Sequence, residues 1–157
     1  ALVAGVNEAL TGAKHIADLF AGCGTMSLPL ADSASVHAVE GEAVMLDALF
    51  AGWRTASGLK PVTTETRDLF RRPLLADELA KFDGVVIDPP RAGADAQSRV
   101  LADHGPDRLA MVSCDPATFA RDAAILTAGG YRIDWIDVVD QFRWSTHVEL
   151  VAALRRD

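Results

Sequence analysis

The chain has 157 residues, of which 50% are hydrophobic and 24% are charged, as expected for one soluble globular domain that spans residues 1–157. Its net charge of −7 argues against a broad electrostatic grip on nucleic acid. No apolar run approaches the ~18 residues that a membrane-spanning helix needs.

Apolar stretches of strand length alternate with stretches of helical period along the chain. We predict a strand at 16–20, a helix at 25–32, a strand at 35–40, a helix at 42–56, a strand at 62–66 and a helix at 73–81 that Pro73 opens. We then predict a strand at 82–88, a helix at 94–103, a strand at 109–113, a helix from the N-cap Asp115 and first-turn Pro116 to about 128, and strands at 131–139 and 147–154.

This alternation predicts an α/β fold, with a seven-stranded, mostly parallel sheet that helices cover on both faces. No helical pattern separates the last two strands, which predicts an antiparallel hairpin at the edge of the sheet. Ligands bind such sheets at the carboxyl ends of the parallel strands. The unusual residues of this chain follow those ends, at 18–25, 40, 68, 88–91 and 113–116.

The turn after the first strand, Gly22-Cys23-Gly24, superficially matches a dinucleotide fingerprint, but Ser27 replaces the third glycine. Asp18 precedes the turn, where a carboxylate would repel a pyrophosphate. A sulfonium cofactor such as S-adenosylmethionine, with its positive charges, would tolerate that acid. Glu40, at the end of the second strand, could accept hydrogen bonds from both ribose hydroxyls. The alternative for this segment is a tight turn with helix-capping acids.

Cys114 follows a predicted buried strand and immediately precedes a helix start. Amide donors and the positive helix end would favour its thiolate form, although a lone cysteine is more often a core residue. Cys23 is interpreted as structural. Two cysteines are too few for a disulfide scaffold, so we expect reduced thiols and a cytoplasmic protein. Glu149, in the last strand, is paired, exposed at the edge, or a proton acceptor.

The loop Asp88-Pro89-Pro90-Arg91 is similar to the Asp-Pro-Pro-aromatic loop of amino-group methyltransferases, but the aromatic ring is absent. Methylation of an adenine amino group is therefore not expected. We expect Arg91 and Arg121 on the RNA side, near phosphates of the target nucleotide. Either arginine could instead pair with a structural acid such as Asp122.

Four motifs together resemble the RNA 5-methyluridine methyltransferase family, in the family's order and over nearly the whole chain: Asp18-Leu19-Phe20-Ala21-Gly22-Cys23-Gly24-Thr25, Asp88-Pro89-Pro90-Arg91-Ala92-Gly93, Ser113-Cys114-Asp115-Pro116-Ala117-Thr118 and His147-Val148-Glu149. The resemblance implies the class I methyltransferase (Rossmann-like) fold and S-adenosyl-L-methionine as cofactor, with no metal. It also implies methyl transfer to C5 of a uridine in RNA. Between the two classes of RNA, which the sequence does not distinguish, we favour ribosomal RNA over tRNA.

By this resemblance, Cys114 is the nucleophile that adds to C6 of the uracil, and Glu149 is the base. The residues that fall where family members hold the cofactor are Phe20, Thr25, Glu40, Asp68 and Asp88. Asp18 and Gly22, from the first strand and its turn, complete the predicted cofactor site.

The chain departs from the family in what surrounds these motifs. It lacks an initiator Met and the family's RNA-binding domain, so we expect a fragment of a longer protein. Ahead of His147 the family commonly has Phe-Pro-x-Thr, whereas this chain has Phe142-Arg143-Trp144-Ser145-Thr146. Two alternatives stay open: a small-molecule methyltransferase in which Cys114 only packs, and a catalytically idle module that binds a cofactor or nucleic acid.

Overall fold

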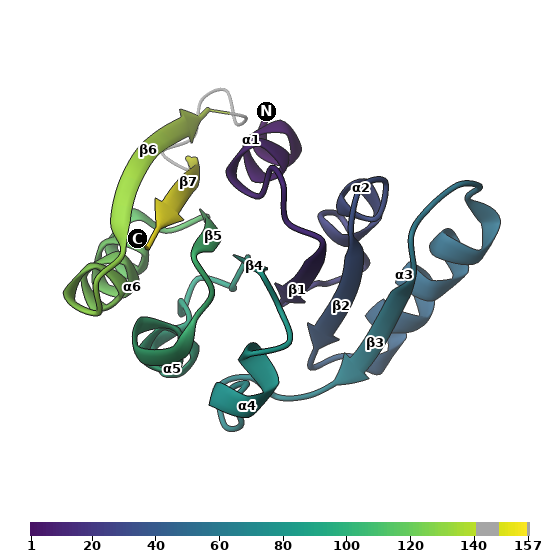
Figure 1. Ribbon diagram of the computed structural model, residues 1–157, viewed down its shortest axis with the longest axis horizontal. Coiled ribbons are helices and arrows are strands. Elements are labelled where there is room, and N and C mark those ends of the chain that lie inside the picture. The colour runs from purple at the N-terminus through teal and green to yellow at the C-terminus, as the bar shows by residue number, and fades with distance from the viewer. Residues whose placement is uncertain (141–147, 157) are drawn as a thin grey trace.

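Near-continuous apolar runs form the central strands of a seven-stranded sheet, because helices cover both faces of those strands (Figure 1). The computed structural model describes residues 1–140 and 148–156. The strands are β1 (His15–Leu19), β2 (Ser35–Glu40), β3 (Val62–Thr66), β4 (Gly84–Ile87), β5 (Arg108–Ser113), β6 (Arg132–Val139) and β7 (Glu149–Arg155). Their order in the sheet is β3-β2-β1-β4-β5-β7-β6.

Strands β1 to β5 pair with one another in parallel, and β7 runs antiparallel between β5 and β6. The predicted mostly parallel sheet and its final antiparallel hairpin are therefore confirmed. The order of the strands reverses between β1 and β4, which are neighbours in the sheet although β2 and β3 separate them in sequence. In open α/β sheets this reversal is where a ligand crevice forms, at the carboxyl ends of the strands.

Six helices cover the two faces of the sheet over the described residues. One face carries α1 (Leu2–Ala9), α2 (Ser27–Leu30) and α3 (Ala43–Thr55), and the other carries α4 (Ala76–Leu79), α5 (Asp95–His104) and α6 (Pro116–Ala128). Each face has its own buried core, built around Val6, Leu30 and Leu49 on the first and around Leu79, Leu101 and Leu126 on the second. None of the helices in the described ranges is long and apolar enough to cross a membrane.

The predicted helix at 73–81 is too long at both ends, because α4 spans only Ala76–Leu79. Gln97 of α5 accepts a hydrogen bond from the Leu74 amide at 2.8 Å and donates one to the Leu74 carbonyl at 3.2 Å. The backbone N–H and C=O of Leu74 are therefore both bonded to the Gln97 side chain, and not to the backbone of a helix. Pro73 therefore lies in the preceding loop and does not open the helix.

Helix α1 is absent from the sequence predictions, since its residues include a glycine and give no capping signal. It forms because Val6 and Ala9 are buried against the sheet. Gly5 lies so close to β7 that a Cβ atom there would be 3.0 Å from Val151 Cγ1. Tertiary packing, and not helix propensity, accounts for this element.

Candidate functional site

The turn after β1 holds a carboxylate from the end of β2. Gly22 donates its backbone N–H to Glu40 Oε2 at 3.0 Å, and Glu42 donates its backbone N–H to Glu40 Oε1 at 3.1 Å. Phe20 adopts a φ of 63°, the one positive φ at a non-glycine residue in the described parts of the chain. Such backbone conformations are concentrated at functional sites. The turn thereby fixes Glu40 at the carboxyl end of β2, one strand away from the switch point between β1 and β4.

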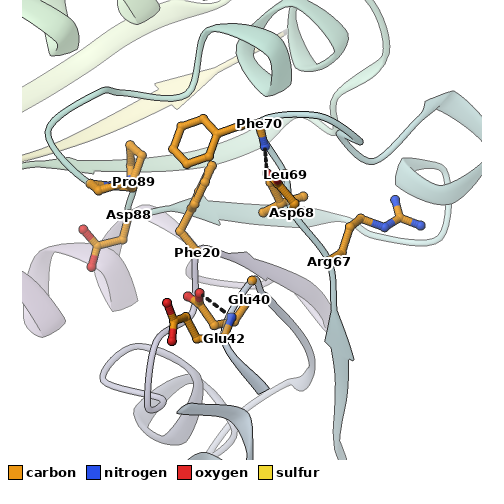
Figure 2. Close-up of a pocket in the computed structure, with 11 residues that line it drawn as sticks. Phe20, Glu40, Glu42, Arg67, Asp68, Leu69, Phe70, Asp88 and Pro89 are labelled. Carbon is orange, nitrogen blue, oxygen red and sulfur yellow. Dashed lines mark hydrogen bonds between the residues drawn. The ribbon is translucent and has the colours of Figure 1, made fainter. Parts of the chain in front are cut away.

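A cavity of about 540 Å³ opens beside this turn at the carboxyl ends of β1, β2, β3 and β4 (Figure 2). Its lining residues are Phe20, Glu40, Gly41, Glu42, Arg67, Asp68, Leu69, Phe70, Asp88, Pro89 and Pro90. The rings of Phe20 and Phe70 lie next to each other, with centroids 5.3 Å apart and planes tilted by 55°. An apolar wall of aromatic rings facing a few carboxylates is a common design for a small-molecule site.

Of the seven residues predicted for the cofactor, four line this cavity: Phe20, Glu40, Asp68 and Asp88. Gly22 and Asp18 lie behind the lining, Gly22 as a donor to Glu40 and Asp18 as a buried residue of β1. Thr25 is exposed and does not line the cavity. Asp68 accepts a hydrogen bond from the Phe70 amide at 3.0 Å and pairs with Arg71 at 3.6 Å.

Sequence reasoning missed several of the lining residues, among them Arg67, Leu69 and Phe70, which surround the predicted Asp68. Their position in the sequence could have indicated them, because they directly follow the carboxyl end of the third predicted strand. An exposed phenylalanine there is unusual, since Phe70 keeps 48% of its surface accessible to solvent. Large apolar side chains left open beside a cavity often mark a binding surface.

A buried carboxyl group, Asp18, and a half-buried one, Asp88, give the site its electrostatic character. Burial raises the pKa of Asp18 to about 7. A hydrogen bond that Ser27 Oγ donates to Asp18 Oδ2 at 2.5 Å acts in the opposite direction and lowers the pKa. The other oxygen, Asp18 Oδ1, is buried without a hydrogen-bond partner in the described structure. Burial also raises the pKa of Asp88 to about 6, with a further contribution from the charge of Glu149. Such a pair of acids favours a positively charged ligand.

Cys114 and Glu149 lie at the same end of the sheet, because Cys114 directly follows β5 and Glu149 begins the antiparallel β7. In the antiparallel pairing of β5 with β7, Ser113 lies opposite Leu150. Continuing that register by one residue places Cys114 opposite Glu149. The thiol is partly exposed, and the charge of Glu149 acts on Asp88, a residue of the cavity wall. The predicted nucleophile and base therefore follow and begin two neighbouring strands, and the electrostatic effect of Glu149 on Asp88 ties this end of the sheet to the cavity wall.

The start of α6, which directly follows Cys114, is capped by its own residue. As predicted, Asp115 is the N-cap, and its carboxylate accepts hydrogen bonds from the amides of Ala117 and Thr118 at 2.9 and 3.0 Å. These two donors are therefore engaged by the cap. The two amides hold the pKa of Asp115 below its usual range, with a smaller contribution from the charge of Arg91.

The two arginines expected on the RNA side differ in their surroundings. Arg91 is exposed, and its charge acts on Asp115 at the start of α6, beside Cys114. Arg121 Nη2 lies 2.7 Å from Oδ1 of the fully buried Asp122 and donates a hydrogen bond to the carbonyl of Ala92 at 3.0 Å. Arg121 thus shows the structural pairing that the sequence left open. His147 and the preceding 142–146 segment lie outside the described residues.

Within the described ranges, no group of three or more His, Cys, Asp or Glu side chains is arranged to hold a metal ion.

Comparisons with known proteins agree on one family. The model of the family described as tRNA (uracil-5-)-methyltransferase matches residues 54–157. An uncharacterized RNA methyltransferase of Rhizobium meliloti is 57% identical over 144 residues, which are 92% of this chain and 35% of that protein. A 23S rRNA (uracil(1939)-C(5))-methyltransferase of Chromohalobacter salexigens is 43% identical over 147 residues, or 93% of this chain and 30% of that protein. The chain thus spans about a third of the length of these relatives.

Among solved structures, the Pyrococcus abyssi tRNA (uracil-54, C5)-methyltransferase in complex with S-adenosyl-L-homocysteine superposes with a TM-score of 0.83 at 32% identity. The match covers 98% of this chain and 37% of that one. The magnesium protoporphyrin IX methyltransferase of Synechocystis, with a TM-score of 0.69 and 22% identity, shares the fold over 98% of this chain and 76% of that one. These likenesses confirm the predicted class I methyltransferase fold.

Proposed function

Because the chain belongs to the tRNA (uracil-5-)-methyltransferase family, we propose that it is the catalytic part of an enzyme that methylates C5 of a uridine in RNA. The observation that supports this proposal is the pairing of Ser113 with Leu150, next to Cys114 and Glu149 in the chain, together with the charge of Glu149 acting on Asp88 of the cavity wall. Ribosomal RNA is the favoured substrate, since the relative named for 23S rRNA is 43% identical and the protein named for tRNA is 32% identical.

The cavity fits S-adenosyl-L-methionine, the methyl donor that we propose for it. Each oxygen of Glu40 accepts one backbone N–H and keeps a lone pair that a ribose hydroxyl could use. The unpartnered Oδ1 of Asp18 and the nearby Asp88 favour a ligand that carries positive charge. A volume of about 540 Å³ is sufficient for a nucleoside with a short side chain. When bound, the cofactor would supply a methyl group on a sulfonium sulfur.

The proposed chemistry explains why a thiol is needed. Uracil C5 is a poor nucleophile, so Cys114 first adds as thiolate to C6, and the electrons of the C5–C6 double bond move into an enolate. C5 then takes the methyl group, and the bond between that methyl group and sulfur breaks. Cysteine suits this role because it is both a good nucleophile and a good leaving group.

Glu149 would complete the reaction as the base. It accepts the proton from C5, the C5–C6 double bond forms again, and the bond from C6 to the Cys114 sulfur breaks. The target uridine has to leave any helical stack to be reached in this way. We propose Arg91, exposed beside the start of α6, as a contact for a phosphate near that nucleotide.

The proposal is tested by trapping in the full-length protein with RNA that contains 5-fluorouridine, because fluorine at C5 prevents release of the adduct. The wild-type protein and Cys23→Ala should form a complex that resists denaturation, whereas Cys114→Ala should form none. Cys23 is a matched control, since it is an exposed cysteine in the same domain. With ordinary uridine RNA, Glu149→Gln should accumulate methylated RNA attached to Cys114, which mass spectrometry would identify.

Other results would reject parts of the proposal. Normal methylation by Cys114→Ala would remove the covalent mechanism and leave a methyltransferase in which the thiol only packs. Normal turnover by Glu149→Gln would assign the base to another group. Faster methylation of tRNA than of ribosomal RNA transcripts would reverse the proposed substrate preference. No effect of S-adenosyl-L-methionine on the melting temperature would argue against a cofactor site.

A further inference from the structure

Arg67 lies directly after β3 and lines the cofactor cavity, yet its side chain turns away from the cavity. Figure 2 shows the guanidinium group pointing away from Phe20 and Glu40. Only 15% of the side chain is exposed. Arg67 Nε donates to Glu65 Oε1 at 2.7 Å, while Nη1 and Nη2 donate to the two oxygens of Glu78 at 3.0 and 2.6 Å. This forked pairing engages the guanidinium on the side remote from the cavity.

The backbone of the same residue is tied to the proposed ribose site. The Arg67 amide donates to the carbonyl of Glu40 at 2.9 Å. Glu78, the partner of the guanidinium, also accepts a hydrogen bond from the Leu75 amide at the start of α4. Arg67 therefore links the end of β2, the end of β3 and α4, and the cavity-wall residues 68–70 follow it directly in the chain.

We propose that Arg67 is a positioning residue, which holds the wall formed by Asp68, Leu69 and Phe70 in place and thereby sets the affinity for the cofactor. The inference rests on the proposed function, because it concerns the cavity assigned above to S-adenosyl-L-methionine. Arg67 acts through this wall and does not itself contact the ligand.

The charges around Arg67 support this role. Arg67 forms ion pairs with the carboxylates of Glu65 and Glu78, and a third carboxylate, Asp68, follows it directly in the sequence. The hydrogen bond from Arg67 is the main cause that lowers the pKa of Glu78 to about 2, so this pair stays charged throughout the neutral range. Without the guanidinium, partly buried carboxylates would lose their counter-charge, and the wall would be free to move.

The test measures S-adenosyl-L-homocysteine binding to the full-length protein by calorimetry. Arg67→Ala and Glu78→Gln should each raise the Kd by about tenfold or more, because each removes a charged hydrogen-bonded partner. Arg67→Lys keeps the charge but not the fork, so its Kd should lie between those of Arg67→Ala and the wild type. Matched controls are Arg72→Ala, on the same loop, and Asp77→Asn, next to Glu78. Both positions are exposed, and their Kd should stay within about twofold of the wild type.

Steady-state kinetics separates positioning from a purely structural role. Positioning predicts a raised KM for S-adenosyl-L-methionine with kcat nearly unchanged at saturation. A lower melting temperature and a lower kcat with an unchanged KM would overturn the inference, as would wild-type affinity in both Arg67→Ala and Glu78→Gln. If Arg67→Ala fails to fold, Glu78→Gln, which keeps the shape of the side chain, decides the question. Failure of the wild-type protein to bind S-adenosyl-L-homocysteine would overturn the proposed function as well.

Discussion

Asp18 should make the stability of the protein depend on pH, because its carboxyl group is wholly buried in β1. Burial raises its pKa from the ordinary 3.8 to about 7, so the folded protein binds this proton more tightly than the unfolded chain does. The stability that protonation contributes is fully present below pH 3.8 and is lost as the pH rises through about 7.

These two pKa values give the size of the effect. Proton linkage predicts that Asp18 alone removes roughly 3 kcal/mol of unfolding free energy between about pH 5 and pH 8. Asp88, with a pKa of about 6, adds a smaller loss of the same sign. Glu78 has a pKa of about 2 and does not titrate in this window. The unliganded protein should therefore be more stable at pH 5 than at pH 8.

The perturbation is Asp18→Asn, which keeps the shape of the side chain and an acceptor for Ser27 but cannot titrate. We measure the unfolding free energy of the variant by urea unfolding at pH 5, 6.5 and 8. Between pH 5 and pH 8, Asp18→Asn should lose roughly 3 kcal/mol less unfolding free energy than the wild type does. Asp47→Asn, at an exposed position of α3, should keep the wild-type dependence. If Asp18→Asn also keeps it, Asp18 is not the titrating group and its assignment as a buried acid with a raised pKa is wrong.

Two further predictions concern the turn after β1. Glu40→Gln should weaken binding of S-adenosyl-L-homocysteine by about 1–3 kcal/mol, because a charged hydrogen-bond acceptor is lost. The control Glu8→Gln, on α1, should leave the affinity unchanged. If calorimetry gives the two variants equal affinities, Glu40 is not part of the site. Gly24→Ala should destabilise the fold by about 2–3 kcal/mol, because its φ is +94° and a Cβ would lie 2.7 Å from Leu49 Cγ. Gly58→Ala, with φ +82° and nothing within 4 Å, should lose only about 1 kcal/mol in urea unfolding; equal losses would mean that crowding by Leu49 is unimportant.

The central strands of this fold were predictable because their apolar runs are nearly unbroken. The confirmed hairpin followed from the missing helical pattern between 131–139 and 147–154. Helix α1 was not predictable, since its stability comes from contacts with β5 and β7 that are remote in sequence. The start of α4 was also missed, because the hydrogen bonds from Gln97 that hold Leu74 depend on the packing of α5.

The candidate site divides in the same way. Glu40, Asp68 and Asp88 were found because each follows the end of a parallel strand, and the sheet brings such positions together. Phe70 and Arg67 were missed, since only the path of the loop after β3 determines that both line the cavity while the guanidinium of Arg67 turns away from it. For Arg121, the sequence could not distinguish a phosphate contact from an ion pair with a structural acid. The structure shows the ion pair, because Arg121 lies next to the carboxylate of Asp122.

The position of β7 between β5 and β6 has a consequence for how the protein is made. The ribosome completes β5 and β6 before β7, yet these two strands are not neighbours in the final sheet. Until β7 inserts, β6 lacks its only partner strand in the described sheet, and β5 exposes an edge that another chain could join. The residues of the cavity, all before 91, can come together earlier. Under the proposed function, the cavity for the cofactor can therefore form on a nascent chain before the proposed base, Glu149, has been made.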